Sequence, residues 1–502
     1  MLRFYVLAIL CLINGAISGG TEKPRVVIVG AGASGIAAAS KLLENGFQNV
    51  VILEAEDRIG GRVCTVEFDD YVVDLGGQWV HGEKGNVAYD LAAPLNLIEH
   101  ATMEKGYYKM YESTGKPIDS TISENVIEFY RRFENDSEPL TNSNISYGET
   151  LENELKNYFK EHPEINEKLQ KELLWHYNLA LTSMDPADNW YDISTNAGTY
   201  EDCDGDKLMN WKERGYSTIL DILMKKIPDP AKELPVMNKT ILNTEVVKVD
   251  YTNEDGTVKV TTQDGKEYVA DHVIMTPSLG VLKAQHETLF DPALPECKLN
   301  SIKGLAFGTA AKIFVAFDDT WFSEKEEEKD NFGFAYLWSE DERKEYESDP
   351  EKKWMLGTIG MFRVQHKPRL LFSWVSSEGA RVLDTLPDDL VFNQTKSMLN
   401  KFLSKDYNVT EPTKMIRSKW TTNKHFLGTY SFRNLETEKR NASTQELSEP
   451  IMRNEKPVIL FGGEATSIKH MSTVHGAIDA GWREAERLIS LYNGNAKNSE
   501  SS

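Results

Sequence analysis

The stretch at residues 25–40, RVVIVGAGASGIAAAS, decides the fold of this chain. Its apolar, β-branched start predicts a strand over 25–29, and the glycine-rich turn that follows leads into a helix. This arrangement brings bare backbone and free N–H groups to the helix N-terminus, where a pyrophosphate binds favourably. The sequence therefore predicts a Rossmann-like dinucleotide site. The residues expected at this site are Gly30, Gly32, Ala33, Ser34 and Gly35.

A second apolar run, NVVILEA, contains Glu54, which lies nineteen residues after Gly35. At this spacing an acid accepts a hydrogen bond from the ribose 2′-OH of a bound dinucleotide. The chain then continues as an Arg-x-Gly-Gly-Arg segment that contains Arg58, Gly61 and Arg62. Adjacent glycines let the backbone approach a ligand closely, and arginines bind phosphate oxygens with two donors at once. We expect these residues to bind the same dinucleotide.

The length of 502 residues suggests two or three domains, because it exceeds that of one ordinary domain. Strand-like segments return after a largely helical, aromatic region at 91–225, so the domains are expected to be discontinuous. We predict a mixed α/β fold. The predicted Rossmann-like cofactor domain comprises 24–95, 226–300 and 450–492. The predicted substrate domain, with a mixed sheet and helices, comprises 96–225 and 301–449. Residues 493–502 are expected to form a disordered tail.

The N-terminus has the pattern of a secretory signal, with Arg3 before the apolar run FYVLAILCLI and small residues at 16–18. We therefore expect a signal peptide at 1–18 and secretion. No membrane anchor is expected, because no later segment is apolar over the length of a span. In a secreted chain, Asn-x-Ser/Thr sites are acceptors for N-glycans. They lie at Asn135, Asn144, Asn238, Asn393, Asn408 and Asn441.

The formal net charge of −22 argues against a nucleic-acid partner, because nucleic-acid binders are usually basic. An acidic field instead steers cationic ligands towards the protein. Removal of the signal leaves Cys64, Cys203 and Cys297, an odd number whose spacing is not that of a zinc site. No metal is expected, and a single disulfide stays open.

Four segments carry a family resemblance, and they occur in order along the chain. They are the N-terminal fingerprint with its double glycine, GGQWVHG at 76–82, FGTAAKIF at 307–314, and GGEAT at 462–466 leading to VHGA at 474–477. The chain resembles the flavin-containing amine oxidases and, within them, the polyamine oxidase branch of spermine oxidase and N1-acetylpolyamine oxidase. The resemblance implies FAD. We expect it to be noncovalent, because the cysteine segment that carries covalent flavin in monoamine oxidases is absent.

The resemblance also implies roles for single residues. Lys312 stands among apolar residues, where burial would lower its pKa, and the family implies that it bonds through a water to the flavin N5. His81 is expected to line the substrate tunnel. The other expected substrate contacts are Trp420, Tyr430, Ser472 and Thr473. The remaining expected cofactor contacts are Gly77, Gln78, Trp79, Val247, Glu464, Thr473 and Val474.

The implied activity is oxidation of spermine, spermidine or their acetylated forms by O2 to an aldehyde, a shorter amine and hydrogen peroxide. Two alternatives stay open: a secreted L-amino-acid oxidase, which needs an arginine clamp for the substrate carboxylate, and a catalytically inactive FAD-binding glycoprotein. Asp479 departs from the family pattern in the helix after VHGA. The acids that would hold distal amines are not assigned, and the candidates are Glu201, Asp202, Asp204 and Asp206.

Overall fold

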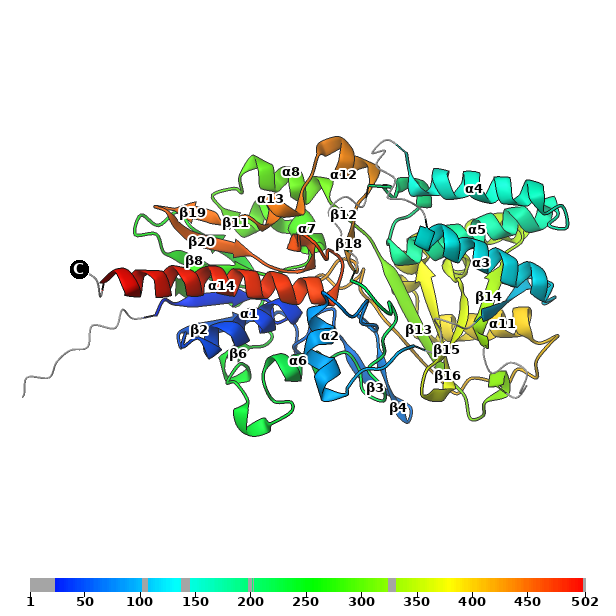
Figure 1. The fold of residues 1–502 in the computed structure, drawn as a ribbon, viewed down its shortest axis with the longest axis horizontal. Coiled ribbons are helices and arrows are strands. Elements are labelled where there is room, and N and C mark those ends of the chain that lie inside the picture. The colour runs from blue at the N-terminus through cyan, green and yellow to red at the C-terminus, as the bar shows by residue number, and fades with distance from the viewer. Residues whose placement is uncertain are drawn as a thin grey trace, which may run out of the picture.

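The structure is a computed structural model that describes residues 23–101, 107–136, 145–196, 201, 203–323 and 331–499. Figure 1 shows an elongated molecule whose two halves are each built on a six-stranded sheet. The predicted mixed α/β class is confirmed. The predicted signal peptide lies outside the described residues, and so does Asp202.

The first sheet has β1 at its centre, paired in parallel with β10 on one side and β2 on the other. Side chains of β1 alternate between two cores: Ile28 packs towards α1, and Val27 packs on the opposite face. Because both faces are covered, the strand reads as a continuous apolar run. In spatial order the strands are β19 (Ile451–Arg453), β20 (Lys456–Phe461), β10 (His272–Met275), β1 (Val26–Val29), β2 (Val50–Leu53) and β6 (Thr240–Ile241).

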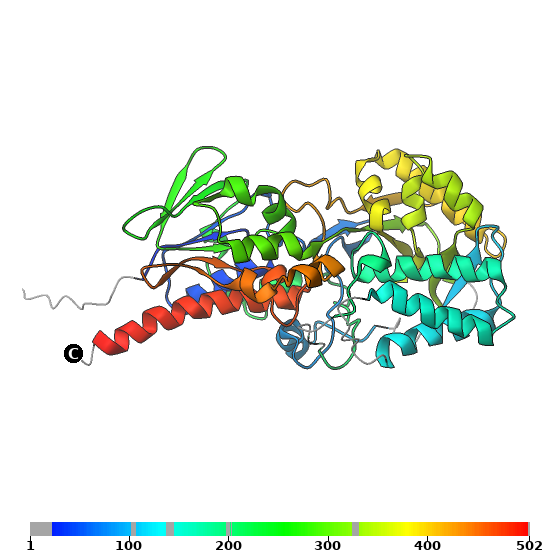
Figure 2. The ribbon, with the colours of Figure 1, turned by 90° about the horizontal axis from the view of Figure 1, so that it is seen from above.

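Helices cover one face of this sheet, and a small mixed sheet with two helices covers the other (Figures 1 and 2). On the first face, α1 (Ala33–Glu44) packs along α14 (Val474–Ser499). The covering layer on the opposite face consists of β7 (Val246–Asp250), β8 (Val258–Thr262), β9 (Glu267–Ala270), β11 (Phe290–Asp291), α7 (Leu279–Leu289) and α8 (Glu296–Gly304).

The second sheet is mixed, because β5 pairs in parallel with β14 while its other pairs are antiparallel. In spatial order its strands are β17 (Lys414–Arg417), β13 (Ala310–Ala316), β16 (Lys367–Ser376), β15 (Gly360–Val364), β14 (Asn331–Leu337) and β5 (Tyr107–Glu112). The helices that pack on it are α3 (Ser120–Asp136), α4 (Tyr147–Glu161) and α5 (Glu167–Met184) on one side, and α10 (Ser377–Thr385) and α11 (Asp388–Leu403) on the other.

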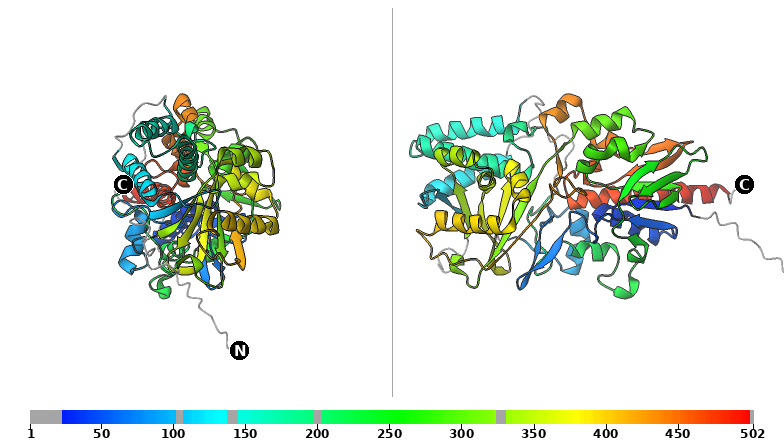
Figure 3. Two further views of the ribbon diagram at one scale, coloured as in Figure 1. Left: turned by 90° about the vertical axis from the view of Figure 1, so that its right-hand side faces the viewer. Right: turned by 180° about the vertical axis from the view of Figure 1, so that it is seen from behind.

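The chain crosses between the halves several times, as the right-hand view in Figure 3 also shows. Strands of the first sheet come from 24–95, 226–300 and 450–492, and those of the second come from 96–225 and 301–449. Two short ribbons lie near the junction: the hairpin of β3 (Thr65–Phe68) with β4 (Tyr71–Asp74), and the pair β12 (Ala306–Phe307) with β18 (Ser431–Phe432). The remaining helices are α2 (Val87–Ala92), α6 (Thr218–Leu223), α9 (Glu340–Glu347), α12 (Leu435–Arg440) and α13 (Thr444–Ser448).

Two details differ from the expectations. The region 91–225, expected to be largely helical, also supplies β5, whose tyrosines suit a strand. The last helix, α14, continues to Ser499, so 493–499 is helical rather than a disordered tail, and no proline interrupts it. None of the helices in the described ranges is long and apolar enough to cross a membrane.

Candidate active site

A cavity of about 990 Å3 lies between the two halves. One end is lined by the glycine turn after β1, by Glu54 and by the double glycine at 60–61. The other end is lined by side chains of α5 and by aromatic residues of the second sheet. Lys312 and Thr473 also border the cavity.

Glycine is needed at three positions of the fingerprint, for a different physical reason at each. Gly30 has a φ of +101°, which disfavours any other residue, and a Cβ on Gly35 would lie 2.0 Å from the Gly30 carbonyl oxygen. Gly32 has an ordinary φ of −69°, and a Cβ there would meet no protein atom closer than 3.9 Å. A side chain at Gly32 would therefore project into open space at the start of α1. The close approach of a ligand explains this glycine best, and the site suits the pyrophosphate of a dinucleotide.

Glu54 ends β2 beside this cradle and is buried. Its carboxylate accepts hydrogen bonds from the backbone N–H of Ala31 at 2.6 Å and of Glu56 at 2.8 Å. Burial raises the pKa of this carboxyl group, while the two backbone donors oppose that rise. Each carboxylate oxygen has a further lone pair, so Glu54 retains acceptor capacity for a ribose hydroxyl.

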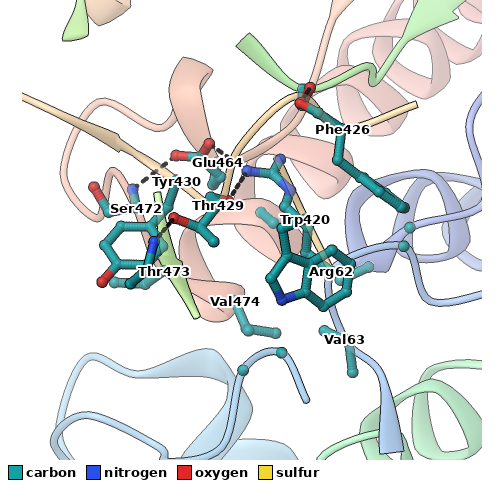
Figure 4. Close-up of a pocket in the computed structure, with 18 of the residues that line it drawn as sticks. Arg62, Val63, Trp420, Phe426, Thr429, Tyr430, Glu464, Ser472, Thr473 and Val474 are labelled. Carbon is teal, nitrogen blue, oxygen red and sulfur yellow. Dashed lines mark hydrogen bonds and ion pairs between the residues drawn. The ribbon is translucent and has the colours of Figure 1, made fainter. Parts of the chain in front are cut away.

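Glu464 and Arg62 form an ion pair in the cavity wall, with 2.9 Å between Nη1 and Oε1 (Figure 4). Arg62 also donates to the carbonyl of Thr429 at 2.7 Å. The second oxygen of Glu464 accepts from the Ser431 hydroxyl and from the backbone N–H of Ser472. Ser472 has a φ of +74°, so Glu464 holds a backbone conformation that a serine rarely adopts. These contacts fix the turn that carries Thr473.

Lys312 lies on β13 and is 2% exposed. Its ammonium donates to the carbonyl oxygens of Asp74 at 3.1 Å and Gly76 at 2.8 Å and to Oε1 of Gln78 at 2.7 Å. Burial lowers the pKa of Lys312, and the negative charge of Asp74 opposes this effect. The same burial raises the pKa of Asp74. The predicted buried lysine is therefore present, and it holds the 74–78 segment at the cavity.

Aromatic side chains form the walls around this lysine. Its Nζ lies 4.7 Å from the ring centroid of Trp374 and 5.4 Å from that of Trp79. Trp420 donates from its indole N–H to the carbonyl of Leu75 at 3.1 Å, and Tyr430 donates from its hydroxyl to the carbonyl of Ser183 at 2.8 Å. These hydrogen bonds leave apolar ring surface for the cavity, where planar ligands and amine chains pack well.

Most residues predicted for the site line this cavity. They are Gly30, Gly32, Ala33, Ser34, Glu54, Gly61, Arg62, Gly77, Gln78, Trp79, His81, Lys312, Trp420, Tyr430, Glu464, Ser472, Thr473 and Val474. Gly35 lies behind the cradle, and Arg58 braces the double glycine by donating to the carbonyl of Gly61 at 2.8 Å. On β7 it is Val246 that lines the cavity, and the side chain of Val247 points outwards because neighbouring strand residues alternate.

The hydroxyl groups at the start of α14 and the His81 ring also have protein partners. The Thr473 hydroxyl donates to the carbonyl of His470 at 2.8 Å and accepts from the N–H of Gly476 at 2.9 Å. Nδ1 of His81 lies 2.7 Å from the carbonyl of Lys207 and is its donor, so the ring is oriented by the 203–209 segment. His81 borders the cavity.

Two acids that the sequence did not reveal line the far end of the cavity. Asp185 follows α5 directly, and Glu134 comes from α3. Burial raises the pKa of Asp185 to about 6, and burial also raises the pKa of Glu134. No described side chain forms a hydrogen bond or ion pair with the Asp185 carboxylate. Of the proposed candidates, Glu201 pairs with Lys469, Asp204 pairs with Lys84, and Asp206 accepts from His100, and none of them lines the cavity.

The geometry is that of a dinucleotide-binding protein with a second, aromatic compartment in the same cavity. A family model described as flavin containing amine oxidoreductase matches residues 33–489. The chain is 30% identical to Polyamine oxidase 1 of Oryza sativa subsp. japonica over 95% of this chain and 99% of that protein. It is 28% identical to the Peroxisomal N(1)-acetyl-spermine/spermidine oxidase of Homo sapiens, over 95% and 97% of the two chains. This chain belongs to the family of flavin-containing amine oxidoreductases.

The fold agrees with this assignment. A solved structure of a putrescine oxidase double mutant superposes with a TM-score of 0.65 at 18% identity, covering 93% of this chain and 99% of that one. FAD is the cofactor. It fits the observed cradle, in which Gly32 leaves room for the pyrophosphate and the carboxylate oxygens of Glu54 can still accept a hydrogen bond from a ribose hydroxyl. It is held noncovalently, and no cysteine is among the residues that line the cavity.

Proposed function

We propose that this FAD-dependent amine oxidase is a polyamine oxidase that acts on spermine, spermidine or their acetylated forms. The products are an aldehyde, a shorter amine and hydrogen peroxide. The observation that carries the proposal is the Asp185 carboxylate, which is partly buried at the end of an aromatic cavity without a described partner. A carboxylate withdrawn from water in this way is costly unless a cation joins it, and a distal ammonium group of a polyamine is such a cation.

Different residues along the cavity have different roles in the proposed reaction. FAD, when bound, would supply the redox chemistry, which is removal of a hydride equivalent from the carbon next to the reacting nitrogen with O2 as the final electron acceptor. Tyr430 and Trp420 confine the substrate chain, and Asp185 and Glu134 hold its distal charge. Lys312 remains close to the reacting end and, with its lowered pKa, holds or releases a proton near neutral pH. The nitrogen to be oxidised must arrive uncharged, whereas the distal nitrogens bind as ammonium groups.

The amino-acid oxidase alternative requires an arginine for the substrate carboxylate, and the cavity does not favour it. Two arginines are among the residues that line the cavity. Arg62 is paired with Glu464, and Arg433 is paired with Glu438 at 2.8 Å. The carboxylate of an amino-acid substrate would also be repelled by the negative charges of Asp185 and Glu134. These contacts support an amine over an amino acid as the substrate.

The deciding experiment is peroxide release by the purified FAD-loaded protein with spermine, N1-acetylspermine, spermidine and L-leucine offered side by side. The flavin spectrum is followed anaerobically with each compound. We expect polyamines to bleach the flavin and yield peroxide, while L-leucine does neither. A response to L-leucine alone would replace the proposal by an amino-acid oxidase. Bound flavin that none of these amines reduces would make the chain an inactive FAD-binding glycoprotein.

We also propose that the protein is secreted and glycosylated. Support comes from the signal-like N-terminus and from Asn238, Asn393, Asn408 and Asn441, which are all exposed. Asn144 and the side chain of Asn135 lie outside the described residues. Within the described part, no disulfide joins Cys64, Cys203 and Cys297. N-terminal sequencing of the mature protein and the mass change on enzymatic deglycosylation test both statements, and an intact Met1 would contradict secretion by this signal.

A further inference from the structure

Three side chains with metal-binding atoms meet beside the cavity: Cys203, His470 and His475. Sγ of Cys203 lies 3.7 Å from Nε2 of His470 and 3.8 Å from Nε2 of His475. All three residues are buried, and their ligand atoms lie within 4.8 Å of one another. The segments that supply them are far apart in the sequence, because Cys203 precedes the two histidines by more than 260 residues.

The two sulfur-to-nitrogen distances match those of a tetrahedral zinc site. Zinc binds thiolate sulfur at about 2.3 Å and imidazole nitrogen at about 2.05 Å, which puts sulfur and nitrogen about 3.6 Å apart at a tetrahedral angle. The two observed distances exceed this value by only 0.1 to 0.2 Å. A thiol has one proton and so can donate to only one of the two imidazoles, whereas a metal ion binds all three atoms at once.

The surroundings orient one of the ligands in the way that metal sites require. Nδ1 of His470 lies 3.2 Å from Oδ2 of Asp479, which accepts the Nδ1 proton. The Nε2 lone pair of His470 then faces Cys203. Metal-bound histidines are regularly held by such a carboxylate on the second ring nitrogen. Orienting the His470 ring would thus be the role of Asp479, the residue that departs from the family pattern in α14.

We propose that Cys203, His470 and His475 bind one zinc ion, with water in the fourth position and Asp479 orienting His470. None of the three ligands lines the cavity, so the ion acts on structure. It ties the 203–209 segment to the loop that leads into α14. Ser472 and Thr473 lie between the two histidines and do border the cavity. The metal therefore holds one wall of the active site in position, and this role does not depend on which amine is oxidised.

Metal analysis of the FAD-loaded protein tests the proposal. We expect about one zinc per chain in the wild type, loss of that zinc in Cys203→Ser, and retention in Cys297→Ser. Cys297 is the matched control, because it is an exposed cysteine on α8 and is not part of the cluster. Full metal content in Cys203→Ser, or none in the wild type after purification with added zinc, would overturn the proposal.

Cobalt provides a second readout that does not rely on a variant that folds. Co2+ added to chelator-treated wild-type protein should produce a thiolate-to-cobalt absorption band in the difference spectrum. The band should persist in Cys297→Ser. If Cys203→Ser fails to fold, Asp479→Asn replaces it. We expect this variant to bind zinc about 10–100-fold more weakly while its flavin spectrum stays native. Absence of the cobalt band in the wild type would exclude Cys203 as a ligand.

Discussion

The carboxylates at the two ends of the cavity differ in the partners that the protein gives them. At the cofactor end, Glu464 has an arginine, a hydroxyl and a backbone N–H as partners. At the substrate end, Asp185 has no described partner for its carboxylate, and burial raises its pKa to about 6. The first carboxylate completes its contacts within the protein and so holds the wall that meets FAD. The second is left for a cation from outside, which is what an amine substrate provides.

The two ends of the cavity also differ in whether backbone or side chains form their walls. The cofactor end is built from glycines that leave room for a ligand, whereas the substrate end is built from tyrosine, tryptophan and histidine side chains. Lys312 stands between these two ends and contacts the 74–78 segment. Variants at Lys312, at the glycines and at Asp185 therefore probe the middle and the two ends separately.

The largest effect is expected for Lys312→Met. Loss of the amine removes a proton-transfer group close to the reacting end, which contributes about 10²–10⁴-fold to such reactions. We expect turnover to fall by at least about a hundredfold, while FAD stays bound. Stopped-flow absorbance of the flavin separates slow reduction from slow reoxidation.

The matched control for this variant is Lys298→Met. Lys298 is also buried and donates to two backbone carbonyls, of Glu446 and Leu447, but it does not line the cavity. This control should lose stability and keep its turnover per bound flavin. If the two variants lose turnover equally, burial of a lysine and not its place in the cavity explains the effect, and the assignment of Lys312 fails.

The next effect tests the cofactor end through two glycines of one turn. Gly32→Ala places its methyl group where no protein atom lies within 3.9 Å, so the apoprotein should keep its melting temperature. The methyl group would crowd the cofactor, and we expect FAD affinity to fall by about 10–100-fold, as an overpacked contact costs about 1–3 kcal/mol. Titration of apoprotein with FAD measures this loss.

Gly35→Ala should behave in the opposite way. Its Cβ would lie 2.0 Å from the Gly30 carbonyl oxygen, so the apoprotein itself should be destabilised. Thermal unfolding of both apoproteins compares the two positions. Equal stability loss in Gly32→Ala and Gly35→Ala would mean that packing, and not the ligand, accounts for Gly32.

These glycines also show why the fold was largely predictable from sequence. The strand over 25–29 and the turn at Gly30 follow from local patterns, because β-branched residues favour strands and a positive φ favours glycine. The same holds for Lys312, whose apolar neighbours indicated a buried strand. β5 was missed because it reaches its sheet only through a partner more than 200 residues away, β14.

The missing parts of the site have a similar cause. Asp185 ends a helix and has no motif around it, so its position in the cavity comes from the packing of α5 on the second sheet. The acids at 201–206 were more conspicuous in the sequence, and those described pair with other charged groups outside the cavity. The meeting of Cys203 with two histidines depends likewise on tertiary contacts, which spacing along the chain does not reveal.

An effect of similar size is expected for Asp185→Asn at the substrate end. The amide keeps the shape of the side chain and removes its charge, so the substrate loses a charge-assisted hydrogen bond of about 1.5–3 kcal/mol. We expect KM for spermine to rise about 10–100-fold above pH 7, with a smaller change in kcat. Steady-state peroxide assays give both values. Glu201→Gln is the control, because Glu201 is exposed and paired with Lys469, and an equal rise in its KM would point to the general acidic field instead.

The last effect is on stability, and here Asp185→Asn should improve the free protein. The pKa of Asp185 is about 6 in the folded state against 3.8 ordinarily, so between these values the folded state binds more protons than the unfolded state. Ionisation of Asp185 therefore lowers the free energy of unfolding as pH rises from about 4 to 6, by up to about 3 kcal/mol. The variant should unfold at a higher temperature than the wild type at pH 8, and the difference should vanish below about pH 4. Saturating spermine should reduce the difference at pH 8, because the substrate cation compensates the wild-type carboxylate. A wild type that is the more stable of the two at pH 8 without substrate would mean that Asp185 already has a partner in the protein.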